Sequence, residues 1–124
     1  MRVKIDTKET FHVISIEEQE LTAIMAAELE NLVKNELTTA GKSLIIDMQH
    51  VQSMDAKLAV SLNELHALVY DSGKSFVICS IQPVVKKTLE EAGVLETLNT
   101  TPTDSEAWDI VQMEEIEREL GMDF

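Results

Sequence analysis

The sequence has a single cysteine and lacks any long hydrophobic run. Cys79 cannot form an internal disulfide bond, and its setting in the apolar stretch 76–79 predicts a buried thiol. No apolar run approaches the roughly 18–20 residues that a membrane-spanning helix needs. Residues 1–6 alternate between apolar and polar side chains, unlike the apolar core of a signal peptide. We therefore expect a cytoplasmic protein with no direct insertion into a membrane.

Basic residues are also scarce. The chain has 10 Lys and Arg against 23 Asp and Glu, which gives a formal net charge of −13. Residues 104–124 hold eight acidic side chains and one basic side chain, Arg118, and so contribute −7 of that total. Binding to nucleic acid or to an anionic membrane needs a basic surface that can neutralise phosphates. The charge therefore disfavours both nucleic acid and anionic membrane surfaces as partners.

The glycines and histidines are too few and too scattered to form a known type of site. Four isolated glycines cannot make a phosphate-binding loop, and the three histidines show no metal-ligand spacing. Asp47 follows an apolar stretch, as the phosphoacceptor of a receiver domain does. However, Asp6 is not part of an acidic pair that could hold Mg²⁺, and no lysine precedes Pro83. We expect no metal, no cofactor and no enzymatic activity.

The apolar periodicity predicts alternating strands and helices in one domain. Buried strands are predicted at 11–16, 44–47 and 75–81, with a short antiparallel partner at 3–5 and a weaker candidate at 94–98. Caps or a first-turn proline predict helices that begin at the following four residues. They are Thr22, Asp55, Pro83 and Thr103. This order predicts an α/β fold with a mixed sheet of four or five strands and about four helices.

The helix that Asp55 begins has an uncharged outer face. Its inward stripe is expected to be Leu58, Leu62, Leu65 and Val69. The opposite face carries only small or uncharged side chains, which is unusual in a chain with 27% charged residues. These residues are Ala56, Val60, Asn63 and Ala67. The face is either a docking surface for a partner or a surface packed within the domain itself.

An ordered set of motifs resembles the STAS domain. It comprises Leu44-Ile45-Ile46-Asp47-Met48, the junction Met54-Asp55, Gly73, Phe76-Val77-Ile78-Cys79 and Pro83-Val84-Val85-Lys86, within roughly residues 11–111. The resemblance implies a non-enzymatic protein-interaction module, similar to the anti-sigma factor antagonists that regulate bacterial transcription. Its protein partner would be an anti-sigma factor that is also a kinase. The alternative that the resemblance leaves open is a STAS regulatory subunit of a lipid-transport ABC complex.

The resemblance also points to a missing switch. In the antagonists, the residue after the aspartate that corresponds to Asp55 is a serine, and the partner kinase phosphorylates it. In this sequence Ala56 occupies that position. Lys57 and Leu58 replace a small residue and a glycine of the family pattern. Ser53 and Ser61 are not at the phosphoacceptor position, and we expect them to be structural. The partner-binding residues implied are Asp55, Ala56, Lys57, Val60, Asn63 and Ala67.

The last predicted helix changes its apolar face midway. Ala107, Trp108 and Val111 form one cluster, and a second cluster lies almost opposite on the same helix. We therefore divide the chain into a domain at 1–112 and an acidic helical extension at 113–124. The extension is either a frayed tail or a contact for a homodimer or another partner. Its apolar residues are Met113, Ile116 and Leu120, followed by Met122 and Phe124.

Overall fold

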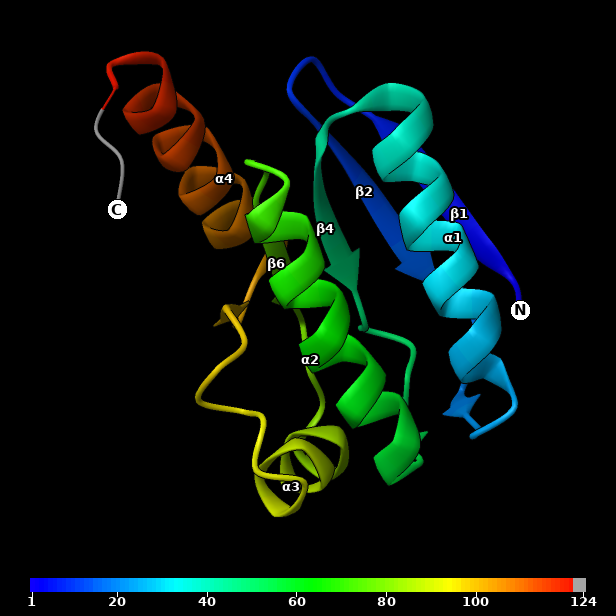
Figure 1. Ribbon diagram of the computed structural model, residues 1–124. Coiled ribbons are helices and arrows are strands. Elements are labelled where there is room, and N and C mark those ends of the chain that lie inside the picture. Colours follow the sequence, from blue (N-terminus) through cyan, green and yellow to red (C-terminus); the bar gives the residue numbers. More distant parts are fainter. Residues whose placement is uncertain (122–124) are drawn as a thin grey trace.

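A mixed sheet with helices on both faces forms the fold (Figure 1). The computed structural model describes residues 1–121. The strands are β1 (Val3–Thr7), β2 (Phe11–Ile16), β4 (Ser43–Asp47), β6 (Phe76–Cys79) and β7 (Thr100–Thr101), in the spatial order β1-β2-β4-β6-β7. β1 and β2 are antiparallel, and the other pairs are parallel. The predicted α/β fold is confirmed.

Four helices cover the sheet. Helices α1 (Met25–Ala40), α2 (Ala56–Asp71) and α3 (Pro83–Glu91) contribute to the larger core on one face. Helix α4 (Asp104–Glu119) packs on the opposite face. The alternation of side chains along each strand divides the apolar residues between the two cores. Ile46 faces the first three helices, for example, while Ile45 faces α4.

The predicted inward stripe of α2 is buried as expected. Leu58, Leu62, Leu65 and Val69 all lie in the larger core. Burying an aliphatic side chain of this size contributes about 1.5–3 kcal/mol, so the stripe fixes the orientation of the helix. Helix α1 ends at Gly41, which has the left-handed φ of 62° and donates its backbone N–H to Leu37. A glycine in this left-handed conformation is a common end to a helix.

Two local predictions are wrong. Thr22 does not cap α1, because its carbonyl closes a turn by accepting from the N–H of Met25, and the helix begins after Ile24. Residues 94–98 do not form a strand. They make a turn in which the N–H of Thr97 donates to Val94, and the place beside β6 is taken by β7 instead. The segment is apolar because Val94 and Leu98 are buried beneath this turn.

Helix α4 has two differently packed halves. In the first half, Ala107 and Val111 are buried against Phe11 and neighbouring strand residues, and the ring of Trp108 lies 5.7 Å from that of Phe11. The side-chain hydroxyl of Thr103 caps the helix by accepting from the N–H of Glu106. The helix continues past residue 112 without a break. The division into 1–112 and 113–124 stays a prediction, and residues 122–124 lie outside the described part.

A polar network holds the second half of α4. Glu115 accepts from the hydroxyl of Ser43 at 2.6 Å, and Arg118 donates both to Glu115 and to the hydroxyl of Ser75. Glu114 accepts from Ser75 and from Tyr70. Both serines are buried; Ser43 is the first residue of β4, and Ser75 directly precedes β6. The helix is therefore attached to the sheet over residues that the sequence left as a possible frayed tail.

Candidate functional site

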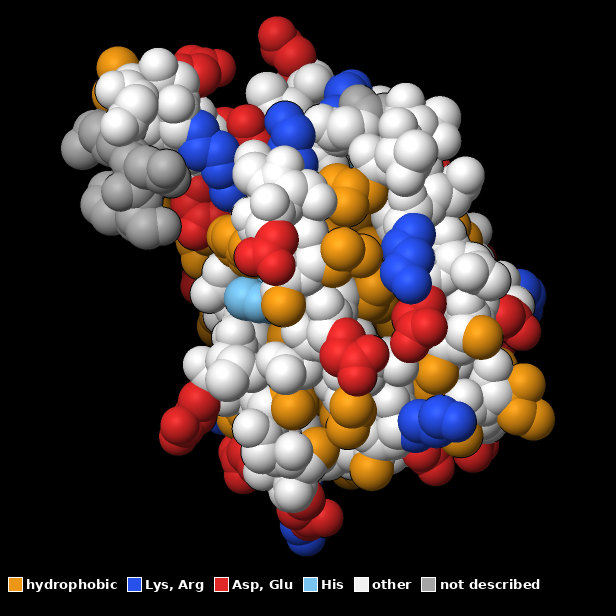
Figure 2. All heavy atoms as spheres, viewed as in Figure 1, with side chains coloured by type: hydrophobic (Ala, Val, Ile, Leu, Met, Phe, Trp, Pro, Cys, Tyr) orange, Lys and Arg blue, Asp and Glu red, His pale blue; other side chains and the backbone are white. Residues whose placement is uncertain are grey.

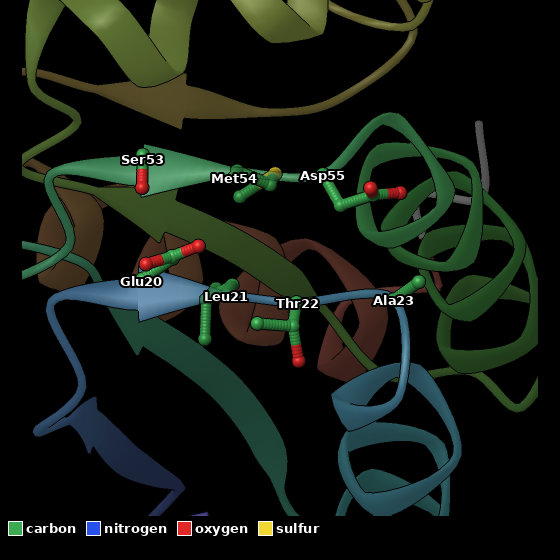
Figure 3. A pocket seen from close by; sticks show the side chains of 7 residues that line it. All are labelled: Glu20, Leu21, Thr22, Ala23, Ser53, Met54 and Asp55. Carbon is green, nitrogen blue, oxygen red and sulfur yellow. The ribbon is translucent and has the colours of Figure 1, made fainter.

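A small pair of strands leads into the first turn of α2. β3 (Glu20–Leu21) and β5 (Ser53–Met54) are parallel, and the segments run side by side in Figure 3. The carbonyl of Gln19 accepts from the N–H groups of Gln52 and Ser53, and Leu21 accepts from Asp55 at 2.8 Å. These bonds fix the chain at the point where α2 begins. The start of the helix is therefore a rigid part of the surface.

A shallow hollow opens beside this strand pair. It has a volume of about 250 Å³ and is lined by Glu20, Leu21, Thr22, Ala23, Ser53, Met54 and Asp55 (Figure 3). Its charged groups are both carboxylates, and its hydroxyls come from Thr22 and Ser53. Within residues 1–121, no group of three or more His, Cys, Asp and Glu side chains could hold a metal ion. The hollow therefore offers polar contacts to a partner and no cation-binding cluster.

Asp55 caps α2, as the sequence predicts. Its backbone is extended, and its side-chain Oδ1 accepts from the N–H of Lys57 at 2.8 Å. Ala56 is the first residue of the helix, and its methyl group is exposed. A helix N-terminus favours negative charge, because its free N–H groups and dipole both point there. The Asp55 carboxylate already occupies part of that favourable position.

The outer face of α2 is largely accessible. Ala56, Lys57 and Ala67 are exposed, and Val60 is 47% exposed. Asn63 differs, because it is partly buried and its Oδ1 accepts from the hydroxyl of Thr97 at 2.6 Å. The packing of the turn after α3 therefore occupies this one side chain. Ala56, Val60 and Ala67 lie along one side of the helix, with Asn63 between Val60 and Ala67.

Two exposed apolar residues near this face were not predicted. Ile24, just before α1, is 83% exposed, and Val84, in the first turn of α3, is 59% exposed. Helices α1, α2 and α3 all begin at the edge where the parallel strands end (Figure 1). Figure 2 shows hydrophobic side chains gathered along the boundary between α1 and α2 and toward this end. Neither residue lies at an inward-facing position of the helix that it begins. An apolar residue outside those positions is the sequence feature that could have indicated an exposed contact.

The two serines near the site are held in structural positions. Ser61 is buried, and its hydroxyl donates to Glu30 of α1 at 3.0 Å. Ser53 is partly buried in β5, where it pairs with Glu20. Neither hydroxyl takes the place of an exposed phosphate acceptor at position 56. The role of Ser61 as a link between α1 and α2 agrees with the structural role expected from the sequence.

Two further groups have pKa values shifted by their surroundings. Burial, with a smaller effect from the charge of Asp47, raises the pKa of the Cys79 thiol to about 12. A thiol with this pKa carries almost no thiolate at neutral pH, so it is a poor nucleophile. Burial also lowers the pKa of His66, while the charge of Glu114 acts in the opposite direction. Cys79 is therefore a neutral member of the packed interior.

The comparison with family models identifies the chain. The model described as "STAS domain" matches residues 2–107, which span most of the sequence. The chain belongs to the STAS domain family. No match was found among curated protein sequences. Among residues 1–121, no helix has the length and apolar character needed to cross a membrane.

Solved structures show the same STAS fold. A serine-to-glutamate variant of RsbS from Moorella thermoacetica is 28% identical, with a TM-score of 0.74 over 90% of this chain and 96% of that one. A chain in the stressosome, described as a signal integration and transduction hub, is also 28% identical, with a TM-score of 0.68 over 88% and 96%. An anti-sigma factor antagonist from Mycobacterium paratuberculosis is 17% identical, with a TM-score of 0.77 over 90% and 93%. Anti-sigma factor antagonists are thus among the structural neighbours of this STAS domain.

Proposed function

We propose that this STAS domain is a non-enzymatic, cytoplasmic binding module. Its docking surface is the outer face of α2, and this surface lacks phosphate control. The observation that carries the proposal is the exposed methyl group of Ala56 at the first position of α2. We infer from the resemblance to the antagonists that their phosphorylated serine corresponds to this position. An alanine has no hydroxyl group to accept a phosphate. The surface therefore keeps one charge state, which corresponds to the unphosphorylated form of an antagonist.

The chemistry of the surrounding surface supports recognition of a protein. Ala56, Val60 and Ala67 present small or apolar groups that a partner can approach closely, and Asp55 and Lys57 add one charge of each sign. Ile24 and Val84 are further exposed apolar side chains at the starts of the neighbouring helices α1 and α3. A surface of this kind gains affinity from the burial of apolar area, with polar groups fixing the orientation. The partner we propose is an anti-sigma factor of the kinase type.

Charge at position 56 provides the direct test. Ala56→Glu places a carboxylate in the contact, and its desolvation is expected to abolish partner binding while the fold persists. Ala56→Gln has nearly the same size without the charge and is expected to retain more binding. Asn35→Glu adds the same charge on an exposed position of α1 and serves as the control for net charge. Retained affinity in Ala56→Glu would remove the proposed surface.

The identity of the captured partner separates this proposal from the alternative. Affinity capture with the full chain from native lysate is expected to recover a kinase-like anti-sigma factor. Recovery of a transport ATPase would instead favour a STAS subunit of a lipid-transport ABC complex. In either case, loss of the captured protein with Ala56→Glu and its retention with Asn35→Glu would assign the contact to the same face of α2.

A further inference from the structure

The outward face of α4 carries an exposed apolar ridge. Met113, Ile116 and Leu120 recur at helical spacing and point away from the smaller core, and Ile116 is 56% exposed. The opposite side of this helical segment is held by hydrogen bonds from Ser43 and Ser75, and by one from Tyr70 of α2. The ridge is therefore presented on a rigid support. A preorganised apolar surface loses little conformational entropy when a partner covers it.

A hollow lies directly beside the ridge. It has a volume of about 300 Å³ and lies between α4 and the hairpin of β1 and β2. Its lining consists of Glu9, Thr10, Phe11, Gln112, Glu115, Ile116 and Glu119. Phe11 and Ile116 contribute apolar groups to this lining, and Glu9 and Glu119 contribute exposed carboxylates. The hollow can therefore accept an apolar side chain that has a positive charge next to it.

Charge around the ridge has one sign. At about 100° per residue, Glu106, Asp109 and Glu117 fall on the same outward side of α4 as the ridge. The only basic residue of the helix, Arg118, turns inward to Glu115 and Ser75. On the adjoining hairpin, the ammonium group of Lys8 is engaged with Asp6 at 3.3 Å and with the face of Trp108. The outward face therefore complements a cationic surface.

We propose that the outward face of α4 and the adjacent hollow bind a cationic amphipathic segment of a protein partner. Apolar side chains of that segment cover Met113 and Ile116, and its Lys or Arg side chains pair with the flanking carboxylates. A second copy of this chain fits less well. Self-association through this face would bring like carboxylates together, and each chain already has a net charge of −13.

The test uses the full chain and two synthetic peptides. One peptide has Leu on a single helical face and Lys elsewhere, and the other has Glu in place of every Lys. We expect the cationic peptide to shift the amide NMR signals of α4 and of the β1–β2 hairpin, while the anionic peptide leaves them unchanged. Equal effects of both peptides, or shifts spread evenly over the acidic surface, would overturn the proposal.

Matched substitutions show whether the ridge makes the contact. Ile116→Thr is expected to weaken binding of the cationic peptide by about tenfold or more, because it removes a central apolar anchor. Ile5→Thr is the control, since Ile5 is 38% exposed on β1 and pairs with Ile14 on the sheet face opposite α4. Equal weakening by both variants would contradict the proposed site. Amide spectra of the free variants check that both remain folded.

Light scattering on the free protein tests the competing occupant. We expect a monomer mass for the chain and for Ile116→Thr. A dimer mass for the parent chain together with a monomer mass for Ile116→Thr would contradict the proposal. It would show that a second copy of the chain, and not a cationic partner, covers the ridge. This inference is independent of the surface proposed on α2, because the two surfaces share no residue. Failure of either test therefore leaves the other proposal intact.

Discussion

The hydroxyl group of Ser75, directly before β6, donates a hydrogen bond to the carboxylate of Glu114 in α4, 39 positions later in the chain. Glu114 also accepts from the hydroxyl of Tyr70 at 2.8 Å, at the far end of α2. One carboxylate thus joins elements from both faces of the sheet. Ser75 is buried, so loss of Glu114 would leave the hydroxyl proton of Ser75 without an acceptor, although its oxygen would still accept from Arg118.

Glu114→Ala is expected to destabilise the protein by about 1–3 kcal/mol, the cost of leaving buried donors unsatisfied. Urea unfolding followed by circular dichroism measures this free energy. Glu119→Ala is the matched control, because Glu119 lies on the same helix with an exposed side chain. Its effect is expected to stay within about 0.5 kcal/mol. Similar losses for the two variants would show that the network contributes little to stability.

Tyr70 is the only tyrosine, so its ionisation can be read directly from phenolate absorbance. Burial, together with the hydrogen bond to Glu114 and the charge of that residue, raises its pKa to about 12. The unfolded chain releases the same proton near pH 10, so the folded state binds the proton more tightly. Stability from this group is therefore present below about pH 10 and lost as the pH rises toward 12.

A spectrophotometric titration of Tyr70 is the corresponding measurement. We expect the folded protein to resist phenolate formation until the pH is well above 10, and to unfold more easily as that proton is lost. Glu114→Gln removes the charge and is expected to lower the pKa of Tyr70 part of the way toward its ordinary value. The rest of the shift comes from burial, which is its largest cause. A pKa that is unchanged in Glu114→Gln would contradict the contribution of the carboxylate.

Asp55 is expected to stabilise α2 independently of any partner. Asp55→Ala removes the acceptor for the N–H of Lys57 and should cost about 1 kcal/mol. Asp55→Asn keeps a side-chain oxygen at the cap and should stay close to the parent in the free energy of unfolding. Denaturant midpoints of the three proteins measure both effects. An equal loss in the two variants would mean that charge, and not capping, is what Asp55 contributes.

The long helices and strands could be predicted because several apolar residues in each of them follow the spacing of that type of element. The continuous run at 44–46 indicates a strand covered on both faces, and the spacing of Leu58, Leu62 and Leu65 indicates one buried helical stripe. Each error in such a pattern is outweighed by several agreeing positions. The same reasoning separates the two apolar clusters of α4, since Ala107 and Ile116 cannot face one surface on a straight helix.

The short elements could not be predicted because their bonds join distant parts of the chain. β3 and β5 have two residues each, too few for any periodic signal. The segment 94–98 shows the opposite problem, since its apolar residues are buried by a turn and the chain there is not extended. Burial alone does not distinguish these two backbone conformations.

The candidate site divides in the same way. A local motif is enough to place Asp55 at the helix cap and Ala56 beside it. The hydrogen bond from Thr97 to Asn63 depends on how the turn after α3 packs, and no feature near Asn63 in the sequence reports it. The hydroxyls of Ser43 and Ser75 are similarly paired with carboxylates far along the chain. In the sequence near these serines, only their position next to a buried strand indicates that their hydroxyls need a hydrogen-bond partner.

The packing of α4 also has a consequence for the order in which the molecule can be completed. Every strand of the sheet precedes this helix in the chain, so all five emerge from the ribosome before it does. Until residues 104–119 follow, Phe11, Ile45 and Val77 have no helix to cover them. A nascent chain at that stage carries a bare apolar sheet face, which is a surface that chaperones bind and that promotes aggregation. Synthesis of the last helix therefore ends the period in which the chain most needs protection.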